Sequence, residues 1–520
     1  MQEDKLSEFG KWRSFFWPIH RWELKKFLPL CLIFALITFN YNLLRAYKDS
    51  MVVTANHSGA ETIPFIKVWA ILPGAILITF IFTRLANRYS REKVFYIMMT
   101  AFLFFFFIFT FVLFPAQDYL HPNGLADRLQ NFLPPGCKGL IALFRNWTFT
   151  LFYVMSELWS TAILSVLFWG FTNEVTSVGE AKRFYGMLTI GGNLAGIGAG
   201  QVASNFTHHF YLSWLPYGKN SWDQSILFLG CAIILSGCAT IAVFRWLNAH
   251  VIKPDEAMHL QNQKSEKIKM SMRKNFAYLA KSKYLICIAA IVVGYNLAMN
   301  LIEVVWKNQI KQVYPDPADF TAYMGDVMTV MGVIATILAV FFTNSFIRRS
   351  WTIAALMPAC IILITGTAFF LFILSEQMDI RWIGAFFGTT PLLLSIACGS
   401  LQQVMARACK YTLFDATKEV AFIPLNPESK LKGKAAIDGV GSRIGKSGGS
   451  LIHQGLLLLF TTVSASTPYV GAIFLIVILI WMAAVLSLGK QFDVLTGQNA
   501  KLNISDPNPE PQSHLMKEGA

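Results

Sequence analysis

The sequence contains twelve stretches of about 20 or more mostly apolar residues, and no other feature constrains the fold as strongly. A helix of about 20 apolar residues crosses the hydrocarbon core of a bilayer. Only 14% of the 520 residues are charged, against roughly 25% in soluble domains. We therefore predict an all-α polytopic membrane protein with twelve transmembrane helices in a lipid bilayer. The stretches lie near 27–48, 63–85, 93–114, 146–170, 184–206, 224–247, 284–306, 321–346, 351–375, 382–408, 433–461 and 468–489.

Basic residues gather on one side of these helices. With twelve spans, Arg21 before the first, Arg88 between the second and third, Arg183 before the fifth and Lys434 before the eleventh share one side. Cytoplasmic loops hold the excess of Lys and Arg, so both termini are predicted to be cytoplasmic. The same rule explains the net charge of +14 without a nucleic-acid partner.

The two sets of six stretches resemble repeats. Tyr41-Asn42-Leu43 recurs as Tyr295-Asn296-Leu297, 254 positions later, and the same offset places Asp49 over Glu303. Two six-helix repeats with a basic second loop are typical of a major-facilitator-like, two-bundle architecture, in which substrate binds between the halves. This architecture favours a monomer. We expect an N-terminal six-helix bundle at 1–247, a cytoplasmic amphipathic connector at 248–283, a C-terminal six-helix bundle at 284–489 and a disordered cytoplasmic tail at 490–520.

Motifs for metal binding or catalysis are missing from the sequence. The eight cysteines form no C-x-x-C pair and have no histidine at metal spacing, so we expect no metal and no cofactor. Gly445-Lys446-Ser447 resembles the end of a P-loop, but Val440 stands where that motif needs glycine, and the segment is an apolar helix. An ATP-hydrolysing pump, or any other enzyme, is therefore not expected.

Ionisable residues within the predicted spans are the candidates for function, because each costs about 2.5–3.5 kcal/mol at the centre of the membrane. Arg45 and Lys48 are three residues apart and share a helix face; the alternative is that both reach out to the interface. Glu157 and Glu303 are the two acids that lie comparably deep. Arg443 and Lys446 in the eleventh span are again three apart.

These cations outnumber the acids, so an anionic ligand is the natural partner. Arginine offers a planar fork to phosphate or carboxylate, and lysine offers a point charge. The glycines around Lys446 either let backbone N–H groups approach an anion or pack helices closely.

Four segments make the chain similar to the nucleotide transporter (ADP,ATP translocase) family of plastids and obligate intracellular bacteria, and most similar to its chlamydial type. They are N-Y-N-L-L-R-A-Y-K-D at 40–49, S-E-L-W at 156–159, N-L-I-E-V-V-W-K at 300–307 and S-R-I-G-K-S-G-G at 442–449. The resemblance carries the family's functional charges to Lys48, Glu157, Glu303 and Lys446. We add Arg45, Asn193 and Arg443 on position alone, with Asn193 aligned to Lys446 by the repeat. Tyr41 or Tyr153 is a candidate for stacking on the base.

The resemblance implies an ATP/ADP antiporter in a bacterial inner membrane, which imports host ATP for ADP by alternating access, as an energy parasite requires. Since ATP carries about one more negative charge than ADP, and a unit charge costs about 2.3 kcal/mol per 100 mV, we expect phosphate to leave with ADP. A proton-coupled nucleotide importer and another organic-phosphate carrier are the alternatives.

Overall fold

The computed structural model describes residues 17–208, 211–252, 282–341, 350–378, 386–425, 433, 434, 437 and 441–505. Within these residues the chain is helical and contains no strand. Apolar segments in a membrane form helices because every backbone N–H and C=O then finds a partner within its own segment. The predicted fold class is confirmed.

The N-terminal half begins with a short 3₁₀ helix, which is followed by a long helix that contains Pro29. Its elements are η2 (Arg21–Glu23), α2 (Leu24–Val53), α3 (Thr62–Ile66), η3 (Lys67–Ile71), α4 (Leu72–Arg88), α5 (Arg91–Ile108), η4 (Phe109–Leu113), α6 (Gln117–Leu120), α7 (Asn123–Phe132), η5 (Pro135–Cys137), α8 (Lys138–Arg145), α9 (Trp147–Trp159), η6 (Ser160–Phe168), α10 (Trp169–Val175), α11 (Val178–His208) and α12 (Ser221–His250).

The C-terminal half repeats this order with fewer short helices between the spans. Its elements are α15 (Lys283–Val313), α16 (Pro317–Phe341), α18 (Trp351–Gln377), α20 (Pro391–Cys409), η7 (Lys410–Phe414), α21 (Asp415–Ala421), α23 (Ser442–Phe460) and α24 (Val463–Ser505). The segments η3, η4, η6 and η7 are π-helical, a form that is frequent at functional sites.

Ten helices in the described part of the chain are long and apolar enough to cross a membrane. The two remaining predicted spans correspond to α11 and α23, which are long helices rich in glycine and polar residues. Their low hydropathy has a physical reason. One face of each helix packs closely on neighbouring helices, α11 on α2 and α16 and α23 on α15, and small and polar side chains allow this close approach.

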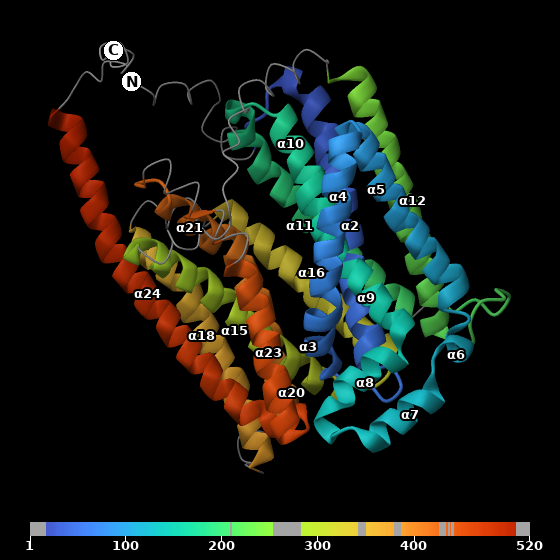
Figure 1. Ribbon diagram of the computed structural model, residues 1–520. Helices are drawn as coiled ribbons and strands as arrows, with labels where there is room; N and C mark the ends of the chain where they lie inside the picture. Colours follow the sequence, from blue (N-terminus) through green and yellow to red (C-terminus); the bar gives the residue numbers. More distant parts are fainter. Residues whose placement is uncertain are drawn as a thin grey trace, which may run out of the picture.

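The two halves lie side by side, close together at the lower end of Figure 1 and divergent toward the upper end, where α2 begins and α24 ends. Contacts between the halves gather at the lower end. Ser50 Oγ donates to Pro317 O (2.8 Å), Lys311 Nζ donates to Ser58 O (2.5 Å), and Gln454 Nε2 donates to Pro64 O (2.9 Å).

The C-terminal helix extends beyond the predicted start of the tail. The C-terminal tail is predicted to be disordered from residue 490, but α24 continues as a helix to Ser505. Phe492 extends the apolar face of this helix and stacks on Trp351 of α18, with ring centroids 5.1 Å apart. Residues 506–520, and nearly all of the predicted connector at 248–283, lie outside the described residues.

Candidate functional site

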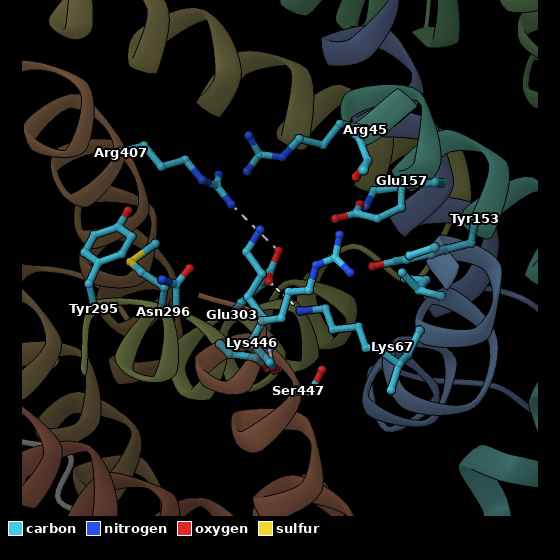
Figure 2. A pocket seen from close by; sticks show the side chains of 18 of the residues that line it. Arg45, Lys67, Tyr153, Glu157, Tyr295, Asn296, Glu303, Arg407, Lys446 and Ser447 are labelled. Atoms are coloured by element: carbon cyan, nitrogen blue, oxygen red, sulfur yellow. Dashed lines mark hydrogen bonds and ion pairs between the residues drawn. The ribbon is translucent and has the colours of Figure 1, made fainter. Parts of the chain in front are cut away.

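A cavity of about 290 Å³ lies between the two halves, and we call it the cationic chamber (Figure 2). Helices α2, α4 and α9 line it from one half, and α15, α20 and α23 from the other. Its lining holds a large excess of positive charge, which suits a polyanion. The basic residues are Arg45, Lys48, Lys67, Arg407, Lys410, Arg443 and Lys446, and the acidic residues are Glu157 and Glu303.

Helix α2 supplies Arg45 and Lys48, which face the same side because they are one helical turn apart. The two residues are only 8% and 6% exposed, so their side chains point into the molecule rather than out to the membrane interface. Lys48 forms an ion pair with Glu157 of α9. Its ammonium also lies 4.2 Å from the centre of the Tyr153 ring, in a cation–π arrangement. Tyr153 therefore braces Lys48.

Glu303 of α15 is the centre of an ion-pair network that joins the halves. Its carboxylate lies 2.9 Å from Lys67 Nζ of the other half, 2.9 Å from Lys307 Nζ and 3.7 Å from Arg407. Lys307 in turn lies 2.8 Å from a carboxylate oxygen of Asp49 on α2, and both side chains are 1% exposed. Two ion pairs, Lys67–Glu303 and Asp49–Lys307, thus cross from one bundle to the other.

Eight of the nine predicted site residues line the cationic chamber: Tyr41, Arg45, Lys48, Tyr153, Glu157, Glu303, Arg443 and Lys446. Asn193 does not. It lines a second cavity of about 300 Å³ beside the first. The repeat alignment paired Asn193 with Lys446, yet the structure places these two side chains in different cavities.

The sequence reasoning missed several charged residues of the site. Lys67, Arg407 and Lys410 line the chamber, and Lys307 pairs with Glu303 of its lining. The expectation of only two deep acids was wrong, because Asp49 is a third. One signal was present for Arg407: it lies 250 positions after Glu157, four short of the 254-position offset of the repeats.

The glycines near Lys446 pack helices. A Cβ atom on Gly445 would lie 2.8 Å from the Cβ of Asn296, and one on Gly449 would lie 2.9 Å from the Cβ of Asn300. Both neighbours belong to α15, so these glycines let α23 approach α15 closely. That close approach brings Lys446 to the chamber beside Glu303.

Comparisons of the sequence give a consistent result. Residues 2–492 match the model of a family described as TLC ATP/ADP transporter. The chain is 43% identical over 502 residues to ADP,ATP carrier protein 1 of Chlamydia pneumoniae, covering 95% of this chain and 96% of that protein. It is also 40% identical over 475 residues to the chloroplastic ADP,ATP carrier protein 1 of Arabidopsis thaliana, covering 91% of this chain and 75% of that protein.

Solved structures of other transporters share the fold at low sequence identity. A D-xylose-proton symporter superposes with a TM-score of 0.54 at 13% identity, covering 89% of this chain and 97% of the symporter. A bacterial homologue of the iron transporter ferroportin superposes with a TM-score of 0.53 at 14% identity, covering 91% of this chain and all of that one. The two-bundle transporter fold predicted from the repeats is confirmed.

Proposed function

The chain belongs to the TLC ATP/ADP transporter family and exchanges ATP for ADP across a membrane; from this premise we propose that it imports ATP, with the phosphate groups held in the cationic chamber. The observation that carries the proposal is the charge of this chamber, with seven basic and two acidic lining residues. Lys446 and Arg443 of α23 and Arg45 and Lys48 of α2 approach from opposite halves. A polyphosphate between them binds both bundles at once.

The network around Glu303 supplies the coupling by alternating access. In this conformation Lys67 and Lys307 link the halves through Glu303 and Asp49. Opening the other side of the carrier separates these partners, which is costly for buried charges. When nucleotide phosphates bind, their negative charges neutralise the cations in place of the carboxylates. The two halves can then move relative to each other. The empty carrier stays locked, and this makes exchange obligatory.

Phosphate is proposed to leave together with ADP. ATP carries about one more negative charge than ADP, and moving a unit charge against the potential costs about 2.3 kcal/mol per 100 mV. Exchange of ATP for ADP alone against an inside-negative potential is opposed by this cost. Phosphate shares its chemistry with the nucleotide tail, and the excess of cations in the chamber suits it.

We place the carrier in a bacterial inner membrane as a monomer, with both termini in the cytoplasm. Both cavities are formed by one chain, so the site needs no second copy. Arg88 ends α4 and Arg91 begins α5 at the end of the molecule where α2 begins. The positive-inside rule then puts that end, and the wide separation of the halves, on the cytoplasmic side.

The test is uptake of labelled ATP into proteoliposomes that are preloaded with ADP, with phosphate, with both or with neither. We expect fast uptake with ADP plus phosphate, slow uptake with ADP alone and none without a counter-substrate. Equal rates with and without internal phosphate would remove phosphate from the cycle. Uptake driven by a pH gradient into vesicles without counter-substrate would instead identify a proton-coupled importer.

A further inference from the structure

The second cavity, of about 300 Å³, differs in character from the cationic chamber that it adjoins. Apolar and thioether side chains dominate its lining, among them Phe34, Leu164, Trp169, Met328 and Met331. Helices α2 and α11 supply one wall, and α16 of the other half supplies the opposite wall. Such a surface suits the flat, uncharged end of a ligand rather than its charged end.

Asn193 is one polar group of this cavity with capacity to bind, and Thr38 Oγ1, which is buried and has no hydrogen-bond partner among the described residues, is another. The Asn193 side chain is half-buried. Among the residues that the structure describes, its amide makes no hydrogen bond. Asn42 in the same lining is engaged, since its Nδ2 donates to Thr38 O at 2.9 Å. The Asn193 amide therefore offers an NH₂ donor group and a carbonyl acceptor to the ligand that occupies the cavity.

We propose that this second cavity is the base chamber of the carrier, in which the Asn193 amide hydrogen-bonds the adenine ring. Adenine presents an amino donor beside a ring-nitrogen acceptor, and an asparagine side chain matches that pair with two hydrogen bonds. The thioethers of Met328 and Met331 and the ring of Trp169 cover the faces of the base. The inference rests on the proposed function and names the half of the substrate that the cationic chamber leaves unassigned.

The junction of the two cavities fits this arrangement. Tyr41, Arg45 and Arg407 line both of them. In Figure 2 the guanidinium groups of Arg45 and Arg407 point toward each other from opposite sides. Two like charges that face each other are favourable around an anion, so the phosphate nearest the ribose lies between them. The base then contacts both halves, because α16 and α11 belong to different bundles.

The experiment compares a ligand that has a base with one that has none. Dissociation constants for ATP and for inorganic tripolyphosphate are measured by calorimetry on the detergent-solubilised carrier. Asn193→Ala is expected to weaken ATP binding at least about tenfold and to leave tripolyphosphate binding unchanged. Asn205→Ala is the matched control, because Asn205 lies on the same helix, is exposed and donates to Gln201 O within its own helix. This control variant is expected to bind both ligands normally.

A second variant and a reference variant separate the possible outcomes. Met331→Ala removes part of the apolar wall and is expected to weaken ATP about threefold or more without affecting tripolyphosphate. Unchanged ATP binding in Asn193→Ala, or an equal loss for both ligands, would overturn the base chamber. Lys446→Ala is expected to weaken both ligands. If Lys446→Ala weakens neither ATP nor tripolyphosphate binding, the assignment of the phosphates to the cationic chamber fails. The base chamber is then decided by Asn193→Ala alone.

Discussion

The fourth spans of the two halves both contain a π-helical segment with a charged residue just before it, but the two charges are opposite. In the N-terminal half, Glu157 lies three residues before the π-helical segment η6, which begins at Ser160. In the C-terminal half, Arg407 lies three residues before η7, which begins at Lys410. Glu157 pairs with Lys48, whereas Arg407 approaches Glu303 at 3.7 Å. The repeat has kept the position of the charged side chain and exchanged its sign.

The first spans also share a feature between the two halves, whereas the fifth spans carry different side chains at equivalent positions. Asn42 of α2 donates to the carbonyl four residues earlier at 2.9 Å, and Asn296 of α15 makes the equivalent bond at 2.8 Å. Yet Asn193 on α11 lines the apolar cavity, and Lys446 on α23 lines the cationic one. A nucleotide also has one charged end and one uncharged end. Two similar bundles with different linings fit a ligand that is itself asymmetric.

The largest effect is expected from removing the cation that joins the two first spans. Lys307→Met leaves Asp49 and Glu303 without their shared partner, which is expected to cost about 3–5 kcal/mol of stability and to abolish exchange. The measurement is the unfolding temperature in detergent together with ADP exchange in vesicles. Adding Asp49→Asn to this variant is expected to restore much of the stability. A double variant that is no more stable than Lys307→Met would contradict the buried pairing.

A somewhat smaller effect is expected at the phosphate end of the C-terminal half. Lys446→Ala removes a charged contact, worth about 1.5–3 kcal/mol, and the dissociation constant of ATP is expected to rise by about 10- to 150-fold. Lys490→Ala is a control on α24, where the side chain is exposed. Normal ATP affinity in Lys446→Ala would place the phosphates elsewhere.

A smaller effect is expected from a substitution at the closed end, where helices of the two halves meet at two places. At one of them α11 passes α16 so closely that a Cβ on Gly200 would lie 2.5 Å from Gly325 O. At the other, Gln454 of α23 hydrogen-bonds Pro64 O. Gly200→Ala therefore strains this closed end by about 1–3 kcal/mol and favours the opposite opening.

Spin-label distances across the closed end check this prediction. The expected result is a larger population with separated halves in Gly200→Ala. Gly198→Ala serves as its control, because a Cβ there meets no atom within 4 Å. Equal distance distributions in both variants would show that the crossing does not hold the carrier closed.

The smallest effect tests how equivalent the first spans are. Asn42→Ala and Asn296→Ala each remove one hydrogen bond to the preceding turn, which is expected to cost about 0.5–1.5 kcal/mol. Thermal unfolding in detergent measures both. Similar losses of stability are expected. A large difference would mean that one asparagine stabilises its half in a way that its counterpart in the other half does not.

Much of this architecture could be predicted because it follows from local properties of the sequence. Long apolar stretches make spans in a bilayer, and the recurrence of Tyr41-Asn42-Leu43 at Tyr295-Asn296-Leu297 revealed the two halves. Charges such as Lys48 and Lys446 stood out because they interrupt apolar helices. Eight of nine predicted site residues then met in one chamber.

The remainder of the site depends on how helices from different halves meet. Lys67 lies near the start of the second span, where a lysine is as expected at an interface as in a cavity. Only the folded structure shows that Lys67 pairs with Glu303 of the other half. The second cavity could not be foreseen either, because its walls come from several helices of both halves, among them α2, α11 and α16. The start of the tail was predicted too early in the sequence, because Phe492 packs on Trp351 of a distant helix.

The most direct test of the account is the efflux of labelled ADP from vesicles with no nucleotide outside. In the proposed mechanism, nucleotide phosphates break the ion pairs of Glu303. The wild-type carrier is therefore expected to release ADP only when a counter-substrate is added. Glu303→Gln removes the carboxylate that Lys67 and Lys307 share, and one-way efflux is expected to rise toward its rate of exchange. Efflux that stays strictly dependent on external nucleotide in Glu303→Gln, with exchange intact, would contradict the account.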